Sequence, residues 1–235
     1  MNINIFLRRY MKTKISRNKS RSAGFTILEL MIASSVFAVV LLIVAIGAIS
    51  FTNSYYKGIT SSEVQSVTRT IMSQVSQSIE FSESLSILTP NNGVAGYCID
   101  NTMYSYELGL EVVNPPNPDP SQDQNNHGLV VNTNASCSSS TTPSLPETPA
   151  LPQFSQELLN QHMRLGEFEI TQLSSNLYSI NLEVIYGDNA ILSPIPSSSL
   201  PLGSSQWSAE NCAPGIGSQF CAISELTTTV EQRLN

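Results

Sequence analysis

Hydrophobic residues along this chain follow two successive helical patterns. From Leu30 to Phe51 there are 22 residues without a charge. A helix of that length spans about 33 Å, enough to cross the hydrocarbon of a bilayer. Further on, apolar residues recur every three or four positions, at Val64, Val67, Ile71, Val75 and Ile79. Such a stripe is typical of an amphipathic helix that buries one face. Together the two patterns predict one helix from Phe25 to about Glu83.

After the helix, the hydrophobic period changes to that of β-strands. Alternating or aromatic-rich segments predict strands at residues 96–99, 103–108, 110–113, 128–132, 167–173, 177–186 and 220–230. Residues 100–101 and 174–176 favour turns, so each joins two strands as a hairpin. The predicted fold class is α+β, with the long helix packed on a small antiparallel sheet with long loops.

The remaining segments are predicted from composition and local pattern. Residues 155–163 predict a short helix with Ser155 as its N-cap. Residues 133–152 are rich in Ser, Thr and Pro and predict a flexible surface loop. Prolines interrupt regular structure at 114–120, because proline lacks a backbone donor.

Charge is distributed very unevenly about the apolar run. Seven bases and no acid precede it, at Arg8, Arg9, Lys12, Lys14, Arg17, Lys19 and Arg21. Bases beside a membrane span are retained in the cytoplasm, so the N-terminus should lie inside and the remainder outside. We therefore divide the chain into a leader (1–24), a transmembrane half-helix (25–52), an amphipathic half-helix (53–84) and an extracytoplasmic β-rich head (85–235).

One acid, Glu29, lies at the cytoplasmic edge of the apolar helix. A carboxylate in that position requires a partner. If the bond between Gly24 and Phe25 is cut, Phe25 gains a free α-amine one helical turn before Glu29. The two charges could then meet within one subunit or between neighbouring subunits.

The basic leader, Gly24 and the run Phe25-Thr26-Ile27-Leu28-Glu29-Leu30-Met31-Ile32-Ala33 resemble the signal of type IV prepilins and type II secretion pseudopilins. The resemblance implies that a membrane peptidase cuts after Gly24 and methylates the amine of Phe25. It also implies that Glu29 guides the subunit into a filament. The implied partners are the prepilin peptidase/methyltransferase, other pilin or pseudopilin subunits and an inner-membrane assembly platform.

Two other interpretations of the N-terminus were weighed. A secretory signal has an apolar core of roughly 7 to 15 residues, shorter than the run in this chain. A single-pass anchor explains the length and the flanking charge, but not the Gly24-Phe25 pair or Glu29. The alternative to a filament subunit is therefore an anchored surface protein, such as an adhesin, that is not assembled.

The four cysteines, Cys98, Cys137, Cys212 and Cys221, all lie in the segment expected outside the cytoplasm. An even number there suggests two disulfides, with three possible connectivities. Cys212 and Cys221 enclose a Pro- and Gly-containing segment that turns easily, so we pair them and leave Cys98 with Cys137. The only histidines, His127 and His162, match no zinc-ligand spacing, and we expect no metal or cofactor.

No stretch of the head carries a catalytic motif, so we expect no enzyme activity. Without the leader, four bases remain against 18 acids, a net charge of −14 that argues against nucleic-acid binding by the head. Trp207, the only tryptophan, is more readily interpreted as a partly buried aromatic than as a binding anchor.

These features predict a structural subunit, a minor pilin or pseudopilin, made as an inner-membrane precursor and carried to a pilus or pseudopilus after processing. The loop-rich head favours a minor over an abundant subunit. The motif does not distinguish a motility pilus from a DNA-uptake pilus or a secretion pseudopilus.

Overall fold

The computed structural model describes residues 24–113, 127–137, 141–146, 151–188, 191–193, 211–213 and 217–233. Its elements, in chain order, are α1 (Ile27–Glu80), β1 (Leu85–Ile87), β2 (Ala95–Ile99), β3 (Thr102–Tyr106), β4 (Leu129–Asn132), β5 (Ser155–Glu157), β6 (Met163–Gln172), β7 (Leu177–Tyr186), β8 (Leu192–Ser193), β9 (Asn211–Cys212), η2 (Ser218–Phe220) and β10 (Ala222–Glu231). Contacts divide the chain into two units, Met1–Ala48 and Ile49–Asn235, so α1 begins in the first unit and ends in the second.

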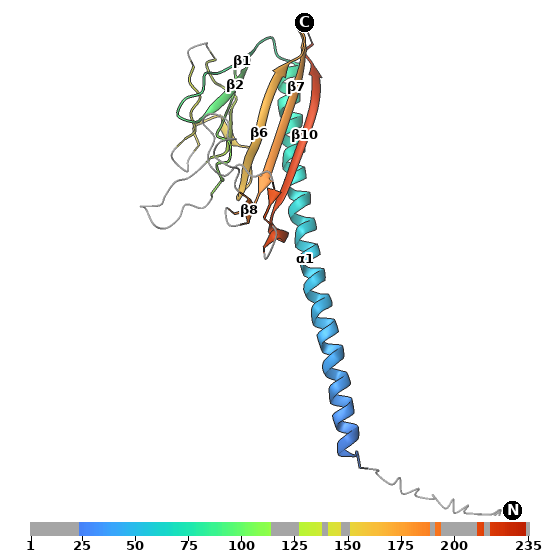
Figure 1. Cartoon of the computed structure of the whole chain (residues 1–235). Coiled ribbons are helices and arrows are strands. Elements are labelled where there is room, and N and C mark those ends of the chain that lie inside the picture. The colour runs from blue at the N-terminus through green and yellow to red at the C-terminus, as the bar shows by residue number, and fades with distance from the viewer. Residues whose placement is uncertain are drawn as a thin grey trace, which may run out of the picture. The chain divides into compact units, whose positions relative to one another are not determined.

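The strands of the second unit form three antiparallel sheets in the described part of the chain. One has the order β1-β2-β3-β4-β5, the second β10-β7-β6 and the third β8-β9. The α+β class with a long helix on antiparallel strands is thus confirmed (Figure 1), but the prediction of one small sheet is wrong. Strand β5 still extends the first sheet, whereas β6, β7 and β10, each ten residues long, pair with one another.

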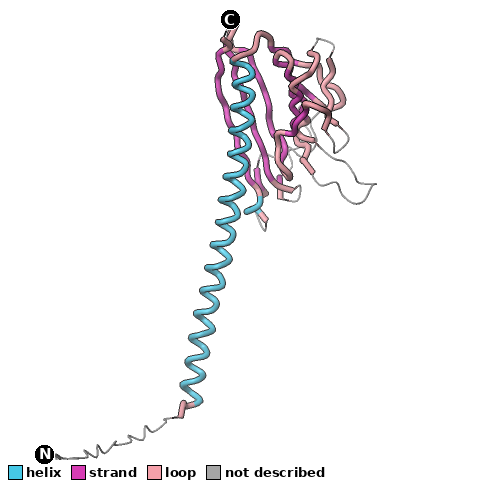
Figure 2. The backbone as a smooth tube through the Cα atoms, turned by 180° about the vertical axis from the view of Figure 1, so that it is seen from behind, coloured by secondary structure: helices cyan, strands magenta, loops and turns pink. Residues whose placement is uncertain are grey.

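The C-terminal part of α1 packs through the predicted stripe. Its buried residues are Thr60, Val64, Thr68, Ile71, Met72, Val75 and Ile79. In Figure 2 this part of the helix runs along one face of the three-stranded sheet. The two polar members of the stripe are compatible with burial, because Thr60 and Thr68 donate their hydroxyls to the carbonyls of Tyr56 and Val64.

The three-stranded and five-stranded sheets share one core. The ring of Phe168 on β6 lies 5.3 Å from that of Tyr97 and 5.1 Å from that of Tyr106, both with edge-to-face geometry. The hydroxyl of Tyr106 donates to the carbonyl of Phe168 at 3.0 Å. Tyr104 reaches the helix, where its hydroxyl lies 2.9 Å from that of Ser78. Burial raises the pKa of Tyr104 and of Tyr106.

The C-terminal end of α1 is held by residues distant in sequence. The carboxylate of Asp100 accepts the backbone N–H groups of Glu83 and Ser84. The side-chain amide of Gln232, which is buried, donates to the carbonyl of Ser82 at 2.7 Å. These contacts pair backbone groups of the residues just after the helix, and the N–H of Arg233 donates to the carbonyl of Glu80, one of the carbonyls that a helix leaves unpaired at its end. The helix stops at Glu80 instead of about Glu83.

The predicted helix at 155–163 is wrong. Residues Ser155–Glu157 form β5, which pairs with β4, and turns then lead into β6. The carboxylate of Glu157 accepts the backbone N–H groups of Gly128, Leu129 and Leu159 at 3.0 Å each. A tertiary attachment to β4 therefore outweighs the helical spacing of the leucines.

Two strand predictions also need correction. Residues 110–113 form no strand; they follow a single bridge between Leu108 and Leu165 and an interruption at Gly109, which has a φ of 75°. Strand β6 begins at Met163, four residues before the predicted start at 167. The missed part contains a register shift between Leu165 and Glu167, which breaks the alternation that marks strands in a sequence.

The other strands agree with prediction within a few residues: β2, β3, β4, β7 and β10. Described residues of the 133–152 segment form neither helix nor strand. Residues 1–23 of the leader, the prolines at 114–120 and Trp207 lie outside the described residues.

Candidate functional site

The start of α1 is built by a local capping interaction. Gly24, Phe25 and Thr26 precede the helix and are exposed. The backbone N–H of Glu29 donates to the hydroxyl oxygen of Thr26 at 3.2 Å, and the N–H of Leu30 donates to its carbonyl at 3.2 Å. Thr26 is thus the N-cap, and Thr-x-x-Glu is the sequence pattern of a capping box. This signal was present in the sequence but was not used to place the helix start, which lies at Ile27 instead of Phe25.

Glu29 lies in the first turn of α1, where it is exposed. The unpaired N–H groups of a helix N-terminus favour a nearby anion. The carboxylate therefore has a stabilising neighbour before any amine is produced, and it remains open to a further partner. Ion pairing with an ammonium group is the chemistry that this arrangement offers.

Behind the first turn, α1 presents large apolar side chains on every side. The exposed fractions of Leu30, Phe37, Leu42 and Ile46 are 63%, 63%, 63% and 67%. The segment passes the length and hydropathy requirements for a membrane span. Ser34 and Ser35 donate their hydroxyls to the carbonyls of Met31 and Ile32, so their polar groups are satisfied within the helix, as a lipid environment demands.

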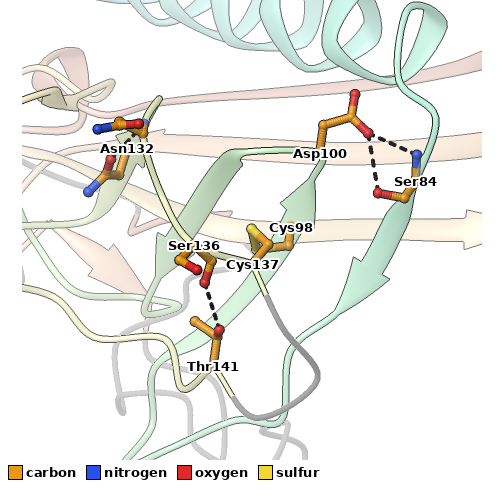
Figure 3. Close-up of a disulfide and its surroundings, with 8 residues drawn as sticks. Ser84, Cys98, Asp100, Asn132, Ser136, Cys137 and Thr141 are labelled. Carbon is orange, nitrogen blue, oxygen red and sulfur yellow. Dashed lines mark hydrogen bonds between the residues drawn. A yellow bond between two sulfur atoms is a disulfide. The ribbon is translucent and has the colours of Figure 1, made fainter.

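The head contains two disulfides in the described residues, one between Cys98 and Cys137 and one between Cys212 and Cys221. The first links β2 to the segment after β4 (Figure 3). In the same region Thr141 donates its hydroxyl to the carbonyl of Ser136 at 2.9 Å. The disulfide attaches the segment after β4 to the five-stranded sheet, whereas the bond between Thr141 and Ser136 lies within that segment.

The head also contains a charged cluster that sequence spacing does not reveal. Glu111, His162 and Asp188 place possible metal-ligand atoms within 4.8 Å of one another. However, Glu111 is already paired: one oxygen lies 2.7 Å from Nη2 of Arg164 and the other 2.9 Å from Nδ1 of His162. Burial lowers the pKa of Arg164, and the charge of Glu111 opposes that shift. The cluster serves to neutralise a buried guanidinium, and its members are up to 77 positions apart in sequence.

His127 is also engaged by an acid, Glu157, with Nδ1 3.3 Å from a carboxylate oxygen. Burial raises the pKa of Glu157, while the backbone N–H groups that it accepts and His127 act in the opposite direction. This pair joins the start of β4 to β5. Neither histidine lies beside a nucleophile with which the described contacts form a triad.

Comparison with known proteins yields one match. A family model described as the prokaryotic N-terminal methylation motif matches residues 19–49. The match therefore covers the N-cap, Glu29 and most of the apolar run, and it does not extend into the head. No curated protein and no solved structure matches the chain.

Proposed function

We propose that this chain is a minor pilin or pseudopilin built into a filament after removal of its leader, because its N-terminal methylation motif supports membership of the type IV pilin and pseudopilin family. The motif implies processing by a prepilin peptidase and assembly with other pilins, and the family is structural. The minor role is favoured by the loop-rich head with its separate sheets.

The leader and the span define how the precursor enters the membrane. Seven bases precede Phe25, whereas the span itself has no charge. The leader therefore stays in the cytoplasm, the helix crosses the inner membrane and the head lies outside. The peptidase, acting from the membrane, then reaches the bond between Gly24 and Phe25, which lies outside the helix in an exposed segment.

Cleavage prepares the helix for assembly. Water hydrolyses the Gly24–Phe25 peptide bond and leaves a carboxylate on Gly24 and an ammonium on Phe25. After that ammonium loses a proton, the neutral amine takes a methyl group from an electrophilic methyl donor, and the product is again cationic. Glu29 attracts the amine of a subunit already in the filament, because two opposite charges in an apolar setting interact far more strongly than in water. The inner-membrane assembly platform moves the subunit from lipid into this contact.

The observation that carries the proposal is the exposure of apolar side chains all round α1 from Ile27 to Phe51, where Ile27 is 82% exposed and Phe51 is 72% exposed. A helix that is hydrophobic on every face must be buried in lipid or among other helices. A pilin subunit meets both conditions in turn, first in the membrane and then in the filament core.

The first test is co-expression of the full chain with a prepilin peptidase, followed by N-terminal sequencing and intact mass measurement. The expected product begins at Phe25. A methyl group on that residue would support the methylation step. Recovery of the intact leader on native material would contradict the proposal and support the anchored surface protein.

A Gly24→Val variant is the matched control for this test. A Cβ at Gly24 meets no atom within 4 Å, so the substitution does not disturb the subunit itself. Loss of cleavage in this variant would therefore show that the peptidase requires glycine at position 24. Cleavage at normal rate would mean that the scissile bond lies elsewhere.

A second test separates cleavage from assembly. Glu29→Ala and Glu29→Gln should leave cleavage intact and reduce incorporation into filaments at least about tenfold, equivalent to about 1.4 kcal/mol. Glu225→Gln, which removes an exposed acid of β10, is the control and should assemble normally. Sheared filament fractions, probed for this subunit, give the measurement. Normal incorporation of both Glu29 variants would refute the charge pairing.

A further inference from the structure

Four aromatic side chains gather just beyond the end of the apolar run. Phe51 stacks on Tyr55 with ring centroids 6.3 Å apart, and Tyr55 lies 6.1 Å from Tyr56. The fourth ring is that of Phe220, whose centroid is 5.4 Å from that of Tyr56. All four remain partly exposed, at 72%, 58%, 44% and 43% in the order Phe51, Tyr55, Tyr56, Phe220. The cluster is therefore not part of the hydrophobic core.

The position of the cluster along the helix corresponds to a membrane surface. Tyr55 and Tyr56 follow Phe51, the last residue of the charge-free run, by four and five positions, which amounts to about 6 to 7.5 Å along a helix. The headgroup layer on each side of the hydrocarbon is about 5 to 7 Å thick. Tyrosine rings are enriched at this level, because the ring is apolar and the hydroxyl is wet.

Phe220 is brought to this level by a rigid part of the head. It ends the short helix η2, and its N–H donates to the carbonyl of Gly217 at 2.8 Å. The next residue, Cys221, is buried beside Ile185 and is bonded to Cys212. The disulfide and the small core thus hold η2 in place while the ring of Phe220 points outward to the helix.

The charge around the cluster differs from that of the protein as a whole. Without the leader, 18 acids face four bases, yet residues 51–59 and 217–221 contain no acid and one base, Lys57. Lys57 is exposed, and its ammonium can extend to phosphate groups from a helix at the interface. Acids near this end of the head, Glu63 and the exposed Asp188, lie outside these two segments.

We propose that η2, through Phe220, together with Tyr55, Tyr56 and Lys57 of α1, forms a contact with the phospholipid headgroup layer while the subunit is still in the membrane. The contact would hold the head against the outer face of the bilayer before assembly. This contact needs the membrane span but neither cleavage nor a filament. The contact can therefore be absent although the proposed function is right, and it can be present although the proposed function is wrong.

The test places a fluorescent probe at the contact. In full-length chain carrying Trp207→Phe, which removes the only tryptophan, single variants Phe220→Trp, Tyr55→Trp and Phe81→Trp are reconstituted in phosphatidylcholine vesicles. This lipid is zwitterionic and has no net charge, so it does not repel the acidic head. A fraction of the lipid carries a nitroxide on the headgroup, which quenches nearby tryptophan. Phe81, 67% exposed at the far end of α1, is the matched control.

The headgroup nitroxide should quench tryptophan at 220 and at 55 at least about twofold more than tryptophan at 81, because interfacial aromatic rings lie among the headgroups. Tyr56→Ser should reduce the quenching when it is added to Phe220→Trp and leave it unchanged when it is added to Tyr55→Trp. Quenching at 55 without quenching at 220 would overturn the proposal, since only the helix would then reach the interface. Equal quenching of tryptophan at 220 and at 81 would also overturn the proposal. So would a tryptophan at 220 that becomes shielded from solvent only when a second copy of the chain is added.

Discussion

The two halves of α1 are one hydrogen-bonded helix, yet they depend on opposite surroundings. From Ile27 to Ile59 no residue is buried, whereas between Thr60 and Ile79 seven residues are buried in the head. The more hydrophobic half is thus the exposed one. Continuous backbone hydrogen bonding does not reveal which surroundings stabilise a helix. The arrangement of apolar side chains does, because an encircling apolar surface needs lipid or other helices, while a stripe needs one packed face.

The largest expected effect compares isoleucines in the two halves. Ile71→Ala should lower the free energy of unfolding of the head by about 2 to 5 kcal/mol, because Ile71 is 1% exposed and its loss leaves a cavity. Ile43→Ala, at a position 65% exposed, should change it by less than about 0.5 kcal/mol. Urea unfolding in detergent, followed by near-UV circular dichroism, measures both. Equal losses of stability would mean that the two halves of α1 contribute equally to the stability of the head.

A smaller effect sharpens the comparison at the contact between α1 and β3. Tyr104→Phe removes the hydroxyl that lies 2.9 Å from Ser78 and should cost about 1 kcal/mol at neutral pH. Tyr55→Phe, in the exposed half, should have no effect on the head.

Tyr104→Phe also changes how the free energy of unfolding depends on pH in alkaline solution. Burial raises the pKa of Tyr104, so above about pH 10 the unfolded chain releases this proton before the folded chain does. Stability contributed by the tyrosine is then lost as pH rises. Tyr104→Phe should therefore show a shallower fall in the free energy of unfolding above pH 10. An unchanged slope would show that this hydroxyl does not titrate differently in the two states.

The smallest effect concerns the N-cap. Thr26→Ala should destabilise the first turn of α1 by about 1 kcal/mol without changing the unfolding of the head, because the cap serves only the start of the exposed half. Hydrogen exchange of the amides of Glu29 and Leu30 should be about fivefold faster in detergent, the ratio that corresponds to 1 kcal/mol. Exchange that is unaffected there would show that the cap contributes nothing in that environment.

Much of the fold could be predicted from local pattern. The stripe of Val64, Ile71, Val75 and Ile79 placed the packed half of α1, and the alternating pattern within Leu177–Tyr186 placed β7 at its observed bounds. The predictions failed where a distant group competed with local preference. Glu157 shows this most clearly, because its bonds to the start of β4 turn a helical pattern into a strand. The start of β6 was missed because a bulge interrupts the alternation.

The candidate site divides in the same way. Its motif residues, Gly24, Phe25 and Glu29, are contiguous and could be named from the sequence, and the cap by Thr26 was readable there as well. The pairing of Arg164 with Glu111, 53 positions apart, was not, nor was the approach of Phe220 to Tyr56. The sequence separation between such partners follows no rule, so the sequence alone does not identify them.

What the sequence by itself determined is the organisation of the first 51 residues: a basic segment, a motif, and a charge-free run long enough to cross a membrane. These are properties of consecutive residues, and hydration and charge act on them directly. Only the tertiary structure decided how the described strands group into three sheets, which acid neutralises the buried Arg164, and that η2 reaches the aromatic residues beyond the span. Those outcomes depend on contacts between segments that become neighbours only when the whole head packs.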